Sequence, residues 1–195
     1  MTPNLKFEIK RKFIHIFALL YIGIYLYFAN KFNHNIGLLS LTIVLAFFLI
    51  LEYFRVLKQK RIPIFHIFWR ESEKNRLGGQ VYFIIGAIIA FGVFDKNIAI
   101  VALLMTIFGD MAAAIFGIAF GKHWIKGFDN RAWEGVTAQF IVDVIIAMMI
   151  LNDLTVSITM AFVATFVETT FSHVDDNLSI PLFSGLIAQI IKLIK

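Results

Sequence analysis

The sequence alternates long apolar runs with short polar connections, and this alternation limits what the chain can fold into. A helix that crosses a bilayer needs about 20 mainly apolar residues, with a range of about 17 to 25. Seven runs come near this length, several of them at its short end: residues 13–29, 36–51, 81–94, 98–120, 136–151, 155–171 and 180–194. With 59% hydrophobic residues, against about 45 to 50% in ordinary soluble domains, the sequence predicts an all-α, polytopic membrane bundle of about seven transmembrane helices.

The organisation of the chain is simple, with two points left open at this stage. The short runs allow one or two helices to be only half inserted. The first run could be a signal peptide, but it is long and no convincing small-residue cleavage site follows Phe28, so we expect it to remain as a span. No internal repeat or domain boundary is visible, and we predict one domain over residues 1–195. The longest polar connection contains an amphipathic piece at 62–69 that is typical of the membrane interface.

The basic residues are distributed unevenly between the connections. Fourteen of the 18 Lys and Arg residues fall on the N-terminal side of the predicted bundle, in segments 1–12, 52–80 and 121–135. Cytoplasmic connections of membrane proteins carry such an excess, so we expect the N-terminus to be cytoplasmic. This topology explains the net charge of +5 without a nucleic-acid partner, because no soluble domain is present to carry a basic face. The absence of cysteine excludes disulfides and thiolate metal sites.

Three acidic residues lie inside apolar runs, where a charge costs about 2.5 to 3.5 kcal/mol on insertion scales. They are Asp110, Asp143 and Glu168, all in the half of their run nearer the N-terminal side. Intramembrane acids usually face the bundle interior or a wet cavity. Together the three predict a polar cavity open to the cytoplasm, although for Asp143 alone a buried hydrogen-bonding role is equally compatible.

A strip of small residues follows the first of these acids. Ala113, Gly117 and Gly121 stand at i+3, i+7 and i+11 from Asp110, which places them on one helix face. Such a strip leaves room for a neighbouring backbone or for a ligand, and a groove that opens toward lipid is one outcome. The small residues by themselves favour helix packing, whereas Asp110 favours a functional role.

A second polar segment, 174–181, joins the last two runs. Asp175, Asp176 and Asn177 offer the hard oxygen ligands that Mg²⁺ takes when it also binds phosphates. The segment is also typical of a helix start, with a polar cap and Pro181 in the first turn, and by itself it favours that interpretation. Single basic residues on the same side could hold phosphates but are individually typical of membrane anchors: Arg11, Lys12, Arg70, Arg76, Lys122 and Arg131.

The motifs occur in a characteristic order along nearly the whole chain. The pieces are 11–15, 52–55, 70–73 with 78–79, 109–110, 117–122, 134–135, and Glu168 followed by 175–181. In this order they resemble the family of small integral-membrane, CTP-dependent lipid kinases that includes dolichol kinase, phytol kinase and the CTP-using diacylglycerol kinase. Two positions depart from the family pattern: Arg131-Ala132 stands where the family has Lys-Ser, and Ile118 where it commonly has Arg.

The resemblance implies transfer of the γ-phosphate of CTP to the hydroxyl of a membrane lipid alcohol at the cytoplasmic face, with Mg²⁺. The acceptor would be a polyprenol or dolichol, phytol or geranylgeraniol, or diacylglycerol. On this hypothesis the catalytic residues are Asp110, Glu134 and Asp176, and Asp110 accepts or orients the hydroxyl proton. The metal would be held by Asp175, Asp176, Asp110 and Glu168. Nucleotide-binding residues would be Lys122, Arg131, Arg76, Arg70, Lys12, Gly121, Gly135 and Asn177.

Two other functions are compatible with the same inventory. A CTP:phosphatidate cytidylyltransferase would also use CTP, Mg²⁺ and a lipid, but the C-terminal stretch rich in Gly, Asp and Arg that marks that family is replaced here by a plain apolar run at 182–195. A transporter or membrane-assembly subunit would need acids at several depths, whereas these lie in one half. The sequence leaves open which lipid is accepted, whether CTP is preferred over ATP, and whether the chain forms a homodimer.

Overall fold

The computed structural model describes residues 16–58, 76–127, 131–171 and 174–195. Predictions that fall on 1–15 and 59–75, including the roles of Lys12 and Arg70 and the amphipathic piece, lie outside the described residues. Within the described ranges the chain is helical apart from turns and one isolated bridge between Trp124 and Ala132.

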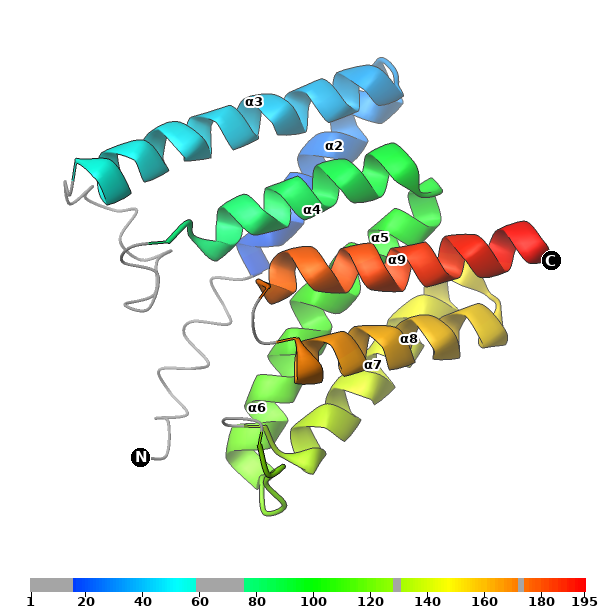
Figure 1. Ribbon diagram of the computed structural model, residues 1–195. Coiled ribbons are helices and arrows are strands. Elements are labelled where there is room, and N and C mark those ends of the chain that lie inside the picture. The colour runs from blue at the N-terminus through cyan, green and yellow to red at the C-terminus, as the bar shows by residue number, and fades with distance from the viewer. Residues whose placement is uncertain (1–15, 59–75, 128–130, 172–173) are drawn as a thin grey trace.

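The helices follow the predicted runs in order (Figure 1). A short turn η1 (Ile16–Ala18) leads into α2 (Leu19–Lys31), and α3 (His34–Glu52) continues into a π-helical turn η2 (Tyr53–Leu57). The next helix is α4 (Gly79–Val93), followed by one rod made of α5 (Lys96–Leu104), the π-helical η5 (Met105–Gly109) and α6 (Asp110–Phe120). The last three helices are α7 (Trp133–Leu151), α8 (Leu154–Thr170) and α9 (Asp176–Ile194).

Four of these rods are long and apolar enough to cross a membrane: His34–Leu57, Lys96–Phe120, Trp133–Leu151 and Asp176–Ile194. Three shorter apolar helices accompany them, at Ile16–Lys31, Gly79–Val93 and Leu154–Thr170. The all-helical prediction is confirmed for the described part of the chain. That all seven helices cross the membrane, with the N-terminus in the cytoplasm, stays a prediction.

The helices pack mainly against antiparallel neighbours. α7 packs between α6 and α8, α8 against α9, and α4 against α3. α4 also packs against α9, which runs parallel to it. As Figure 1 shows, α2 and α3 lie on one side of the molecule and the α7–α8 hairpin on the other, with α4, α5 and α9 between them. The arrangement brings the ends of α6 and α8 and the starts of α7 and α9 to the same end of the bundle.

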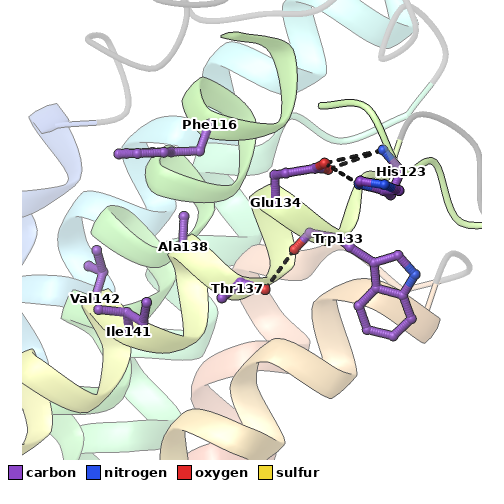
Figure 2. A pocket seen from close by; sticks show the side chains of 8 residues that line it. All are labelled: Phe116, His123, Trp133, Glu134, Thr137, Ala138, Ile141 and Val142. Carbon is purple, nitrogen blue, oxygen red and sulfur yellow. Dashed lines mark hydrogen bonds and ion pairs between the residues drawn. The ribbon is translucent and has the colours of Figure 1, made fainter. Parts of the chain in front are cut away.

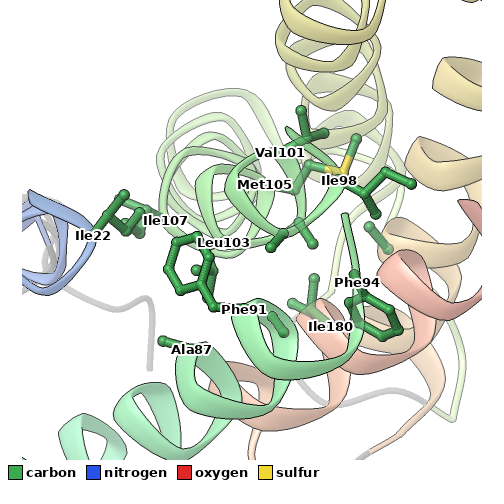
Figure 3. Packing of buried hydrophobic residues seen from close by; sticks show 14 of the residues in the cluster. Ile22, Ala87, Phe91, Phe94, Ile98, Val101, Leu103, Met105, Ile107 and Ile180 are labelled. Atoms are coloured by element: carbon green, nitrogen blue, oxygen red, sulfur yellow. The ribbon is translucent and has the colours of Figure 1, made fainter. Parts of the chain in front are cut away.

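The apolar core surrounds the rod that carries Asp110. Val101 and Leu103 of α5 and Met105 of η5 pack against Phe91 of α4 and Ile180 of α9 (Figure 3). This rod is buried over a larger share of its length than the other three long rods, and so is the centre of the bundle. Asp110, the first residue of α6, therefore lies on the central rod of the bundle.

A π-helical segment lies directly before Asp110. It spans Met105–Gly109, and its residues are buried except for the partly exposed Phe108. π-Helical turns in α-helices are rare and frequent at functional sites, because the extra residue changes the direction of the side chains that follow. The sequence contains no proline or polar insertion in this segment that would have predicted it.

The start of α9 corrects the prediction for the last run. The helix begins at Asp176, not at residue 180, so Pro181 is its sixth residue and not part of its first turn. Proline has no N–H, so the Asn177 carbonyl has no α-helical donor at this position. The backbone of α4 lies close by, because a Cβ placed on Gly86 would be 2.9 Å from the Asn177 oxygen and 3.2 Å from Pro181 Cγ.

Candidate functional site

Arg131 joins three segments that are far apart in the sequence. One guanidinium nitrogen, Nη1, forms an ion pair with the Glu168 carboxylate at the end of α8. The other, Nη2, donates to the Glu168 carbonyl oxygen at 3.0 Å and lies 3.5 Å from Asp176 Oδ2 at the start of α9. A single side chain before α7 thus connects the end of α8 with the start of α9.

The backbone around Arg131 is held by the segment that follows α6. The Ile125 N–H donates to the Arg131 carbonyl at 2.9 Å, and the Trp133 N–H donates to the His123 carbonyl at 3.0 Å. These bonds flank the bridge between Trp124 and Ala132. Because backbone pairing on both sides limits its movement, Arg131 is presented to α8 and α9 from a fixed position.

Three carboxylates act on this guanidinium, those of Glu168, Asp176 and Asp110. The Glu168 side chain is fully buried, whereas Arg131 and Asp176 retain 28% and 34% of their side-chain exposure. Burial disfavours the charged guanidinium, but the attraction of Glu168, followed by that of Asp176 and Asp110, outweighs it and raises the pKa of Arg131 above its ordinary value. Arg131 therefore carries its charge in this site.

Asp143 approaches the same group from inside the bundle. Its side chain is fully buried on α7 and lies against the backbone of Gly109, where a Cβ would overlap its carboxylate. It is also close enough to Glu168 and Asp110 for their charges to act on it. The three intramembrane acids of the sequence thus come together at one depth, with Asp176 at the edge of the group.

The segment before α9 serves first as a helix cap. Asp175 Oδ1 accepts hydrogen bonds from the backbone N–H of Asn177 at 3.0 Å and from its side-chain amide at 2.7 Å. The cap interpretation is therefore confirmed for Asp175, while Asn177 is buried behind it. Only Asp176, the next residue, is aimed at Arg131.

The predicted metal ligands do not form a cage. Among the residues that the structure describes, no group of three or more His, Asp or Glu side chains is arranged to hold a metal ion. Mg²⁺ is, however, commonly bound by one or two carboxylates together with substrate phosphates. Asp176 and Asp110, which flank Arg131, fit that mode better than the capping residue Asp175 does. The metal site stays a prediction.

Glu134 has a structural partner on the other side of α7. Its Oε1 accepts hydrogen bonds from the backbone N–H of Lys122 at 3.1 Å and of His123 at 3.2 Å, and lies 2.7 Å from His123 Nδ1. The carboxylate therefore holds the segment after α6 against the first turn of α7 (Figure 2). This partner, His123, was not among the predicted site residues, and its separation of 11 residues from Glu134 matches no local motif.

The strip of small residues on α6 is filled by α7. A Cβ on Gly135 would lie 2.5 Å from the Ala113 carbonyl oxygen and 3.1 Å from the Gly117 Cα. A Cβ on Gly121 would overlap the Gly117 carbonyl and lie 3.0 Å from Ala132 Cβ. The packing interpretation of the strip is confirmed, and the expected lipid-facing groove along it is wrong because another backbone occupies that space.

Two further predicted cations, Lys122 and Arg76, are among the described residues and lie at the same end of the bundle. Lys122 is exposed beside Glu134, and Arg76 is exposed just before α4. The Arg76 carbonyl accepts a hydrogen bond of 2.5 Å from Arg55, which is paired at 2.5 Å with the buried carboxylate of Glu52. The structure therefore assigns the predicted 52–55 motif to holding the start of α4.

An apolar groove of about 470 Å³ lies between α6 and α7 (Figure 2). Phe116 lines it from α6, and Ala138, Ile141 and Val142 line it from α7. Its polar end is formed by Glu134 and His123, next to Trp133. The sequence does not indicate this groove, because its apolar residues do not differ from ordinary lipid-facing ones.

Comparison with known proteins identifies relatives by sequence alone. No family model matches the chain, and no solved structure matches it. A CTP-dependent diacylglycerol kinase of Saccharomyces cerevisiae is 28% identical over 148 residues, which is 72% of this chain and 49% of that protein. A probable chloroplastic phytol kinase of Triticum aestivum is 31% identical over 138 residues, or 61% of this chain and 46% of that protein.

A third relative has the same extent as this chain. It is an uncharacterized protein of Rickettsia prowazekii, 26% identical over 93% of both sequences. The chain spans only about half the length of the yeast and wheat proteins that it matches. These matches confirm the resemblance that the motifs indicated: the chain is similar in sequence to CTP-dependent lipid kinases.

Proposed function

We propose that this protein transfers the γ-phosphate of CTP to the hydroxyl of a membrane lipid alcohol. The observation that carries the proposal is the group built around Arg131, where one fixed cation meets Glu168 and Asp176 near Asp110. The names of the yeast and wheat relatives support CTP as the donor and a lipid alcohol as the acceptor.

Phosphoryl transfer depends mostly on positioning and on neutralising phosphate charge. Arg131 offers a planar set of donors that matches phosphate geometry, and its ion pair with the buried Glu168 fixes its direction. Lys122 and Arg76, exposed at the same end of the bundle, supply further positive charge for a triphosphate. In this scheme the nucleotide binds where α7 and α9 begin.

A bound Mg²⁺ would neutralise the triphosphate and orient it. Asp176 and Asp110 are the side chains that would hold it, one from the start of α9 and one from the start of α6. Asp110 begins the 11-residue helix α6 and so lies about 15 Å inside the end at Phe120. At that depth it can also accept or orient the proton of a lipid hydroxyl that enters from the bilayer.

The orientation of the site belongs to the same proposal. Lys and Arg are concentrated in the connections at this end of the bundle. An excess of basic residues is characteristic of cytoplasmic connections. The site would then face the cytoplasm, where nucleotides are available.

The direct test uses CTP labelled at either the α- or the γ-phosphate. The protein in mild detergent is incubated with Mg²⁺ and a panel of prenols, phytol, diacylglycerol and phosphatidate. Label that enters a lipid alcohol only from the γ position supports the proposal and identifies the acceptor. Label that enters phosphatidate only from the α position would replace it with cytidylyl transfer, and no transfer from either position would contradict both.

A matched pair of variants connects the activity to the site. Arg131→Gln removes the central cation, and Lys192→Gln removes a cation that is paired with Asp95 at 2.5 Å at the opposite end of the bundle. We expect a loss of about 100-fold or more in turnover for the first variant, as for other groups that stabilise transferring charge. The Lys192 variant should retain wild-type turnover.

A further inference from the structure

The groove between α6 and α7 has the polarity of an amphipathic ligand. Its body is formed by Phe116, Ala138, Ile141 and Val142, and its volume of about 470 Å³ is within the usual range of about 300 to 1,000 Å³ for ligand pockets. Only one end is charged, at Glu134 and its partner His123 (Figure 2). A long apolar body with a single polar end fits one hydrocarbon chain that carries a polar head.

The groove opens on an exposed apolar surface of α6 and α7, and its polar end lies beside a tryptophan. α7 is one of the helices able to cross a membrane, and Trp133, 58% exposed, is its first residue. Tryptophan concentrates at the membrane–water interface. Phe120 and Ile145 extend the exposed apolar surface beyond the groove on the same two helices. We therefore expect the polar end of the groove to lie at the interface and its body to extend into the hydrocarbon region.

The polar end is suited to an alcohol. His123 Nδ1 lies 2.7 Å from Glu134 Oε1, and an ionised carboxylate can only accept, so the ring donates from Nδ1. In the neutral ring Nε2 is then an acceptor, and the His123 side chain is 77% exposed at the mouth of the groove. A hydroxyl group, which can donate to Nε2, is complementary to this end.

The groove is also connected to the phosphate-binding side of the proposed site. Glu134 follows Arg131 by three residues, so their Cα atoms are at most about 11 Å apart. The hydrogen bond from Trp133 N–H to the His123 carbonyl, 3.0 Å long, fixes His123 beside the same stretch of backbone. A lipid head at the mouth of the groove would therefore lie near Arg131 along the chain, at the start of α7.

We propose that the α6–α7 groove is the docking site that the acceptor lipid alcohol occupies before transfer, with its hydrocarbon chain along Ala138 and Ile141 and its head at His123. The hydroxyl then reaches Asp110 and the phosphate in a later step. The inference rests on the proposed kinase function for the identity of the lipid. It adds a location for that lipid and a binding role for His123, which acts in positioning the head group.

The first test measures binding without catalysis. Diazirine-bearing diacylglycerol and a diazirine-bearing prenol are crosslinked to the full chain in detergent, and labelled peptides are mapped by mass spectrometry. At least one probe should label residues 110–120 and 133–142, and excess unlabelled alcohol should compete. Ala138→Trp, which fills the groove, should abolish this labelling, whereas Met149→Trp, at an exposed position near the other end of α7, should not. Labelling that is absent, not competed, or retained in Ala138→Trp would overturn the proposal.

The second test separates binding from chemistry. Ala138→Trp should raise KM for the lipid at least tenfold and leave KM for CTP within twofold of wild type. His123→Ala should raise lipid KM by about threefold to tenfold, the effect of one lost hydrogen bond, with kcat retained. A fall in kcat with unchanged lipid KM would contradict the docking role of His123. If crosslinking in the groove is competed by unlabelled alcohol but the protein transfers no γ-phosphate, the lipid-docking role of the groove stands and the kinase function is rejected.

Discussion

The ion pair between Arg131 and Glu168 should be a principal stabilising contact at the functional end of the bundle. Removing one partner of a buried ion pair typically costs about 3 to 5 kcal/mol, because the other charge remains in a medium of low polarity. Glu168 is fully buried, but Arg131 keeps 28% of its side-chain exposure and so is partly solvated. We therefore expect Arg131→Ala to lower the free energy of unfolding by about 2 kcal/mol, below the range for a fully buried pair.

The Glu168→Gln background tests the cause of that loss. Glutamine keeps the shape of the side chain but removes the buried charge, so in this background Arg131→Ala should cost less than about 1 kcal/mol, the contribution of ordinary hydrogen bonds. Arg131→Lys should be intermediate, because one ammonium group cannot donate along both guanidinium directions that reach the Glu168 carboxylate and carbonyl.

The assay is equilibrium unfolding in mixed micelles of mild detergent and SDS, followed by tryptophan fluorescence. All single and double variants are measured at one pH and one ionic strength. The reasoning would be refuted if Arg131→Ala cost the same in the wild-type and Glu168→Gln backgrounds to within about 0.5 kcal/mol, since contacting residues should be coupled by at least that amount.

Three further predictions concern packing, catalysis and pH. Gly135→Leu should destabilise the protein by about 1 to 3 kcal/mol in the same unfolding assay because α6 occupies the space of a side chain there. Gly92→Ala should be tolerated, because apart from the adjacent backbone of its own helix no heavy atom lies within 4 Å of its Cβ position. Asp110→Asn should lower turnover by about 100-fold or more in a protein that still unfolds cooperatively, and near wild-type turnover would exclude it as the proton acceptor. The hydrogen bond from Lys195 lowers the pKa of Asp153 in the folded protein. The ionised carboxylate therefore stabilises the fold at pH values above its unfolded pKa of about 4. This stabilisation is lost as the pH falls through the lower pKa of the folded state. The difference in melting temperature between wild type and Asp153→Asn should therefore be present at pH 7 and shrink below about pH 4.

The local character of the chain could be predicted from its sequence. Hydropathy located the helices, because each must satisfy its backbone polar groups within an apolar segment. The capping role of Asp175 was also accessible, since an N-cap depends only on residues a few positions away. The start of α9 was placed too late because an apolar criterion excludes 176–179, polar residues that the cap and the neighbouring helices accommodate.

The tertiary structure decided which polar residues meet. The sequence identified Arg131, Glu168 and Asp176 as candidates, but their separations of 37 and 45 residues contain no local signal for contact. The sequence also did not determine whether the small residues on α6 would face a ligand or another helix, because Gly117 permits both. In the structure the backbone of α7 at Gly135 occupies the space beside Gly117. The apolar groove depends on the angle between two helices and on side chains that resemble any lipid-facing surface. The sequence by itself therefore determined the helices and the chemical inventory through short-range and bilayer constraints, whereas pairing, closure and the groove arose from long-range packing.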